Sequence, residues 1–120
     1  KNYMFYMFDP NYICLFGLTP FLFSSIYNIN NIHSLFILIF GILFHTNKTN
    51  NYFRTLDIIQ CFLNGGMVFY LDPDARIYGI LSLCLYLINT KYFNRNNYIH
   101  TLIQLSAWRG ICVYENKLTN

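Results

Sequence analysis

Hydrophobic positions along the chain gather in five segments that are separated by short polar stretches. The segments are residues 12–27, 32–45, 56–71, 77–90 and 98–114. Few polar positions recur within them, whereas a helix on the surface of a globular bundle shows a polar face at every turn. Pro20 lies inside the first segment and predicts a kink, because proline lacks the N–H of a helical hydrogen bond. The pattern predicts an all-α protein.

The lengths of the segments bear on whether they cross a membrane. Each is shorter than the roughly 20 residues of a membrane-spanning helix, but flanking Asn and Tyr residues extend most of them by a turn. Buried helices of a soluble bundle would show similar lengths. Five nearly apolar segments in succession nevertheless favour a polytopic integral membrane helical bundle. We therefore predict a single membrane domain over residues 1–120, with four to five transmembrane helices.

Composition also favours a membrane location. The chain has 120 residues, of which 55% are hydrophobic and 11% are charged, whereas soluble domains carry about 25% charged residues. Basic residues concentrate in the loops on the side of the N-terminus, so the positive-inside rule places the N-terminus inside and the C-terminus outside. The abundance of Asn, Ile, Tyr and Phe is typical of AT-rich genomes, and it indicates a mitochondrial inner membrane or a viral internal membrane.

The charge and the cysteines narrow the predicted partners. The net charge of +3 includes no run of Lys or Arg, which argues against a nucleic-acid partner. The partners we predict are membrane lipids and other membrane subunits. The four cysteines lie inside apolar segments without a C-x-x-C pair, so we interpret them as small buried hydrophobic residues rather than as zinc ligands or disulfides.

Four side chains are candidates for chemistry. His45 closes the second segment, Asp57 opens the third and His100 opens the fifth. Gln104 lies one turn after His100 on the same side of the helix. In a membrane bundle these ends share one face, and neutral imidazoles with a carboxylate beside them suit a hydrolytic zinc site. The alternatives are interfacial roles for the histidines and a helix cap for Asp57.

Two short stretches carry a resemblance to a known family. "LFHTNKTNNYFRTLD", with His45 and Asp57, and "HTLIQLSAWRG", with His100, resemble motifs of the seven-helix membrane hydrolase superfamily. That superfamily includes alkaline ceramidases, progestin/adiponectin-type receptors and haemolysin-III-like proteins. The resemblance implies zinc held by histidines, with Asp57 beside the metal. Gly41 stands where the family has Ser and Gln104 where it has a third His, which implies a degenerate site.

Arg109 is the strongest anomaly, because it lies inside the fifth apolar segment. A charged residue in such a segment needs a partner or must reach the surface. We predict an ion pair with Asp72 or Asp74 in the turn between the third and fourth helices. A partner subunit or an anionic lipid headgroup would be the alternative partner.

"NGG", residues 64–66, interrupts the third segment. Glycine lets helices approach closely, and an Asn side chain hydrogen-bonds across a helix interface. We therefore assign Asn64, Gly65 and Gly66 to helix packing, with a hinge or a polar step in a pathway as the alternative.

These observations lead to two main hypotheses about function. The first is a structural or accessory subunit of a larger membrane-associated assembly, which needs no cofactor and is not an enzyme. The alternative is a membrane-embedded, metal-dependent lipid hydrolase, or a degenerate relative of one. In that hydrolase Asp57 would be catalytic, and His45, His100 and Gln104 would hold zinc. A small transporter subunit is disfavoured, because the segments lack a mid-membrane carboxylate or lysine.

Overall fold

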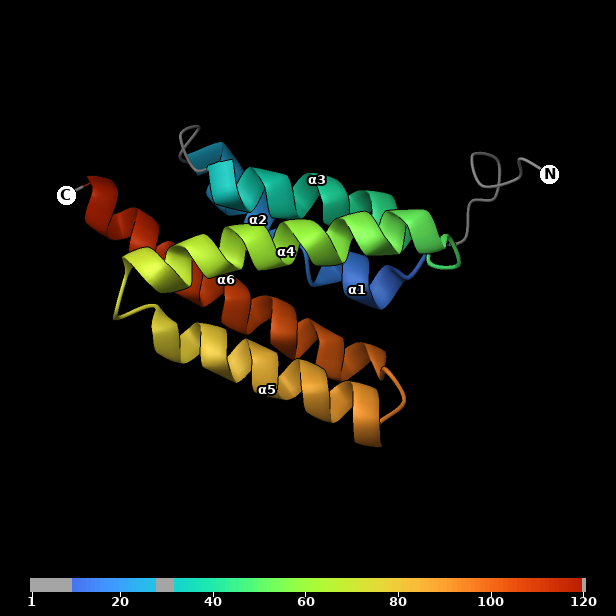
Figure 1. Cartoon of the computed structure of the whole chain (residues 1–120). Helices are drawn as coiled ribbons and strands as arrows, with labels where there is room; N and C mark the ends of the chain where they lie inside the picture. Colours follow the sequence, from blue (N-terminus) through green and yellow to red (C-terminus); the bar gives the residue numbers. More distant parts are fainter. Residues whose placement is uncertain (1–9, 28–31, 120) are drawn as a thin grey trace.

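The computed structural model describes residues 10–27 and 32–119, and these residues confirm the all-α prediction (Figure 1). The helices are α1 (Tyr12–Phe16), α2 (Thr19–Tyr27), α3 (Ile32–Thr46), α4 (Asn51–Leu71), α5 (Arg76–Tyr92) and α6 (Asn97–Thr119). α3 packs against α4, and α5 packs along α6, so two antiparallel hairpins form most of the molecule. α1 and α2 lie between the hairpins and contact both α3 and α6.

The predicted membrane location is wrong for this part of the chain. Among residues 10–27 and 32–119, no helix combines the length and the apolar character that are needed to cross a membrane. α3 is strongly apolar but has 15 residues, a rise of about 22 Å, against a hydrocarbon core about 30 Å thick. α4 and α6 are longer, with 21 and 23 residues, but polar side chains such as Gln60 and Gln104 interrupt them.

This finding corrects four related predictions. The transmembrane bundle of four to five spans is not supported, and neither is the orientation with the N-terminus inside and the C-terminus outside. The mitochondrial inner membrane and the viral internal membrane lose their basis as locations for an integral membrane protein. The sequence misled us because low charge and abundant aromatic residues are typical of membrane helices. Here many of those residues lie on the outer faces of short helices.

Capping residues explain why the helices begin where they do. The Asn50 side chain accepts hydrogen bonds from Tyr52 N and Phe53 N, so α4 begins at Asn51 rather than at residue 56. Asp57 therefore lies inside α4, and the alternative role as a helix cap is wrong. Asn96 caps α6 in the same way. Side-chain caps of this kind stabilise a helix by about 1 kcal/mol each.

The first hydrophobic segment is not one kinked helix. It breaks after Phe16 into α1 and α2, and Gly17 and Leu18 join the two. Pro20 is the second residue of α2. Proline is tolerated in the first turn, because the N–H groups there have no partner within the helix. The proline therefore belongs to a helix start, and the predicted kink is wrong.

A small apolar core lies where α2, α3 and α6 meet the turn between α4 and α5. Its members are Leu18, Phe21, Ile37, Leu38, Val68, Ala75 and Ile111. Gly41 contributes to this packing, because a Cβ atom there would lie 2.9 Å from the Leu18 methyl groups. Gly41 is therefore needed for close contact between α3 and Leu18.

The predicted ion pair of Arg109 is wrong. Lys117 instead contacts both acids, with Nζ 2.7 Å from Oδ1 of the buried Asp72 and in contact with Asp74. Arg109 lies on an exposed face of α6, away from the turn. Lys117 lies about two turns further along α6. It fastens the end of this helix to the turn between α4 and α5.

The "NGG" prediction divides into two outcomes. Asn64 does bond across a helix interface, since its Oδ1 lies 3.0 Å from His33 Nδ1 on α3. Gly65 and Gly66 do not serve close packing, because no atom lies within 4 Å of a Cβ atom built at either position. That part of the prediction is wrong. The two glycines border open space instead.

Candidate metal centre

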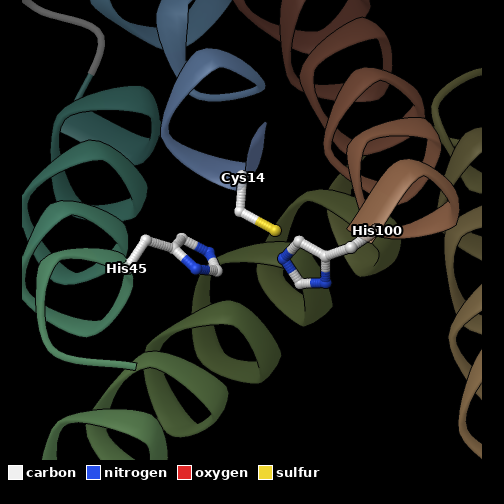
Figure 2. A group of neighbouring side chains, drawn as sticks. All are labelled: Cys14, His45 and His100. Atoms are coloured by element: carbon white, nitrogen blue, oxygen red, sulfur yellow. The ribbon is translucent and has the colours of Figure 1, made fainter. Parts of the chain in front are cut away.

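Three side chains from separate helices converge at one end of the bundle. Cys14 comes from α1, His45 from the end of α3 and His100 from the start of α6. One ligand atom from each of them lies within 4.8 Å of the other two. Figure 2 shows the three side chains pointing toward a common centre. The imidazole rings meet edge to face, with centroids 5.0 Å apart.

Asn11 fastens together the three helix ends that carry these side chains. Its side chain caps α1 by accepting a hydrogen bond from Cys14 N. Its backbone N–H donates to His45 O at 2.6 Å, and its Nδ2 donates to Asn97 Oδ1 at 3.0 Å. A single residue thus links α1, α3 and α6, and it fixes the relative positions of the three candidate ligands.

The turn before α6 positions His100. Asn94 and Arg95 adopt left-handed conformations, with φ values of 51° and 57°. Asn89 accepts a hydrogen bond from Asn96 N and donates one to Asn96 O. Asn tolerates the left-handed region better than most residues, and these bonds hold the α5–α6 turn closed.

Gln104 lies beside the three candidate ligands. Its Nε2 donates to Cys14 O at 3.0 Å, so it supports α1. Its Oε1 is buried and has no hydrogen-bond partner among the described residues. A Cβ atom at Gly17 would lie only 1.9 Å from this oxygen. That Gln104 also binds zinc stays a prediction.

Burial keeps both histidines neutral at pH 7. Burial and the nearby His100 lower the pKa of His45 to about 3. Burial lowers the pKa of His100 to about 4. A neutral imidazole offers the lone pair that a metal needs, and His45 Nδ1 has no hydrogen-bond partner among the described residues. The buried His45 and the half-buried His100 thus both offer a nitrogen lone pair at this centre.

Cys14 completes a donor set that suits zinc. Burial raises the pKa of its thiol to about 11, so a metal would bind with release of a proton. Two imidazoles and one thiolate are typical zinc ligands, with three protein ligands and one open position in catalytic sites. Tetrahedral zinc would need ligand atoms about 3.5 Å apart. Separations of up to 4.8 Å would therefore have to shorten by at most about 1.3 Å.

Asp57 lies close to the three ligands and belongs to the same pocket. Burial raises its pKa to about 6, although a hydrogen bond from Gln60 Nε2 at 3.1 Å opposes this shift. Its charge also raises the pKa of the Cys14 thiol. A carboxylate whose pKa lies this close to neutrality is suited to accept and return a proton.

The pocket is a cavity of about 400 Å³ between α4 and the α5–α6 hairpin. Figure 1 shows α4 and α5 diverging from the turn that joins them. Both helices contribute residues to the lining of the pocket. His45, Asp57 and His100 contribute to its polar end. Its walls are mainly apolar and include Ile58, Phe62, Phe69, Ile80, Leu83 and Tyr86. Gly65 and Gly66 also line the pocket, so the open space beside the two glycines is part of it.

Three of the residues singled out from the sequence, His45, His100 and Asp57, line one pocket. Their metal-binding and catalytic roles stay predictions. Cys14 was missed because it lies in an apolar segment far from the histidines in sequence. The only signal nearby is Asn11, which predicts a helix start but not its contacts with His45 and Asn97.

Comparison of the chain with protein-family models, with curated proteins and with solved structures finds no match. The resemblance to the seven-helix hydrolases thus stays a prediction.

Proposed function

We propose that this protein is a metal-dependent hydrolase that acts on a substrate with an apolar chain. The observation that carries the proposal is the convergence of Cys14, His45 and His100, of which the two histidines line the polar end of an apolar pocket. Buried titratable groups that lack ordinary partners cluster at functional sites. Apolar side chains alone would fill the same space at a lower cost in desolvation.

Zinc is the metal that best fits these residues. Cys14, His45 and His100 would hold it, and the pocket leaves room for a substrate on one side. When bound, zinc supplies Lewis-acid activation of water and of a carbonyl group. The role of the three residues is to orient the ion and to keep their nitrogen and sulfur atoms free of competing protons.

Asp57 would act as the general base. With a pKa of about 6 it is mostly ionised at pH 7, and it can take a proton from water and return it to the leaving group. The apolar walls would hold the hydrocarbon part of the substrate and exclude bulk water. This arrangement favours esters or amides of long-chain acids, which join a hydrolysable group to an apolar chain.

The test of this proposal is zinc binding and hydrolysis by matched variants. Cys14→Ser, His45→Ala and His100→Ala should each abolish stoichiometric zinc in the purified protein. Cys84→Ser is the control, because Cys84 is exposed on α5 and should leave zinc binding unchanged. Asp57→Asn should keep zinc but lose hydrolysis of a long-chain acyl ester or amide by at least about 100-fold. Equal zinc content in all five proteins would refute the metal site.

A second candidate function has its own supporting observation. Large apolar side chains are exposed on several helices, among them Phe36, Phe62, Leu63, Tyr70, Ile77 and Leu87. Monomeric proteins rarely expose apolar patches larger than a few hundred Å². The protein could thus be an accessory subunit whose outer faces are covered by other subunits, or by lipids. Light scattering at rising concentration tests this candidate, since a monomer without detergent or partner would contradict it.

A further inference from the structure

A chain of hydrogen bonds connects Asp57 to a second buried histidine. Gln60 Nε2 donates to Asp57 Oδ1 at 3.1 Å, and Asn64 Nδ2 donates to Gln60 Oε1 at 3.3 Å. Asn64 Oδ1 then lies 3.0 Å from His33 Nδ1. The first three residues follow one face of α4, and His33 lies near the start of α3. This polar chain runs about 10 Å along α4 from the pocket.

The hydrogen bonds of the polar chain can run in only one direction from donor to acceptor. Asn64 Nδ2 also donates to Gln60 O at 3.0 Å, which fixes the orientation of the Asn64 amide. Its Oδ1 must therefore face His33, and His33 Nδ1 must carry a proton to donate. The same orientation places the Gln60 carbonyl oxygen toward Asn64 and its NH₂ group toward Asp57 and Cys61. Each amide in the chain is thus oriented by the next.

The His33 end of the polar chain is also buried and is held by fixed contacts. The His33 side chain is 5% exposed, and its ring meets Tyr114 edge to face at 5.7 Å. Glu115 is buried nearby and interacts electrostatically with His33. This end therefore has fixed partners from α6 as well as from α4.

We propose that His33 and Asn64 are positioning residues for Asp57. The inference rests on the proposed function, because Asp57 is the group whose orientation matters. Without His33, Asn64 Oδ1 loses its donor, and the Asn64 amide is held only by its bonds to Gln60. A Gln60 amide that turned over in response would direct its carbonyl oxygen at the Asp57 carboxylate. Networks of this type hold a catalytic group in one geometry through residues that do not touch the substrate.

The coupling is measurable by NMR without metal or substrate. In the whole protein labelled with ¹⁵N, His33 Nδ1 should carry a proton. Asp57→Asn should shift the His33 Nδ1 signal, and this shift should vanish in an Asn64→Leu background. A His33 Nδ1 without a proton, or a shift that persists in Asn64→Leu, would overturn the polar chain. This measurement keeps its meaning even if no hydrolase activity is found.

Kinetics then test the positioning role. His33→Phe removes the donor and should lower kcat about 10-fold, with KM and zinc content unchanged. His33→Gln keeps an NH₂ donor and should restore most of the rate. Tyr114→Leu is the control, because it removes only the ring contact with His33 and should leave kcat near the original value. Equal losses in all three variants would show a merely structural role.

Failure of the two proposals can be told apart. Absence of zinc binding with an intact His33–Asp57 coupling would refute the hydrolase and keep the polar chain. Zinc binding and hydrolysis that are insensitive to His33→Phe would keep the hydrolase and refute the positioning role.

Discussion

At the N-terminal end of α6, His100 lies with Cys14 and His45 in a buried group that contains no ion pair. At the C-terminal end of the same helix, Lys117 bonds to Asp72 and Asp74. Hydrogen bonding to Lys117 lowers the pKa of Asp72, so the charged form is favoured there. Burial lowers the pKa of both histidines, so their charged forms are disfavoured.

The comparison separates a structural end, at Lys117, from a candidate functional end, at Cys14. Paired charges at the structural end fasten a turn to a helix. Polar donors at the Cys14 end cost desolvation free energy that no ion pair offsets. Groups of this kind cluster at functional sites, and this difference is the main physical support for the proposed metal centre.

The largest effect that would sharpen the comparison is stabilisation by zinc. At a free zinc concentration 1,000 times the Kd, zinc should raise the free energy of unfolding by about 4 kcal/mol. Thermal denaturation with and without zinc measures this effect. His100→Ala should remove it, while Lys117→Met should not. A zinc effect of equal size in both variants would mean that zinc binds elsewhere.

Acid should lower the free energy of unfolding of the metal-free protein, and His45 and His100 should cause the first part of this loss as the pH falls. Below pH 6.5 the unfolded chain binds protons at His45 and His100 that the folded protein excludes until about pH 3 to 4. Below about pH 6 the folded protein binds one proton at Asp57 that the unfolded chain, with a carboxyl pKa of 3.8, does not. Two protons against one would leave a loss of about 1.4 kcal/mol per pH unit between pH 6 and 4. Burial also raises the pKa of Glu115, so proton binding at Glu115 in the folded protein reduces this loss.

Urea denaturation at several pH values measures this slope. The contribution of Asp72 is lost at lower pH. The pKa of Asp72 is lowered in the folded protein, so its ionised form stabilises the fold. That stability is lost as the pH falls below 3.8 and through the lowered pKa. His45→Leu should flatten the slope between pH 6 and 4. A stability that stays constant down to pH 4 would contradict the burial of neutral histidines.

Two glycine variants test the packing of the functional end. Gly17→Ala should lower the free energy of unfolding by about 1–3 kcal/mol, because the new Cβ would meet Gln104 Oε1 at 1.9 Å. Moving this side chain would also break its bond to Cys14 O. Gly66→Ala faces open space and should instead add about 0.5–1 kcal/mol through helix propensity. Chemical denaturation distinguishes the two signs.

The smallest effect is expected at the structural end. Lys117→Met should lower Tm, because the buried Asp72 carboxylate would lose its cation. Arg109→Met is the matched control on the same helix, since Arg109 is exposed and has no ion pair within the described residues. Equal changes in Tm for the two variants would show that the Lys117 contacts contribute nothing specific.

Hydrophobic pattern predicted the helices well but not their surroundings. The five apolar segments do become helical, because local pattern and capping residues such as Asn50 act over a few positions. These segments do not reveal whether they lie in a membrane, since the same apolar residue types occur on exposed helix faces and on faces that contact lipid. The ion pair of Arg109 was likewise predicted from a topology that placed Arg109 and the turn with Asp72 and Asp74 at the same end of the bundle. Arg109 lies on an exposed side of α6 instead, and Lys117 pairs with both acids.

The sequence singled out some residues of the candidate site and missed Cys14. His45, Asp57 and His100 were found because helix ends that follow each other along the chain alternate between two ends of a bundle. Cys14 was missed because its position depends on Asn11, which bonds to α3 and α6 at the same time. Contacts among three segments far apart in sequence leave no trace in any one of them.

X-ray absorption spectroscopy at the zinc edge of the zinc-loaded protein tests the central claim most directly. We predict one sulfur and two imidazole nitrogens around the ion, with the sulfur lost in Cys14→Ser and retained in Cys84→Ser. Absence of zinc, or a shell without sulfur in the unmodified protein, would contradict the metal centre.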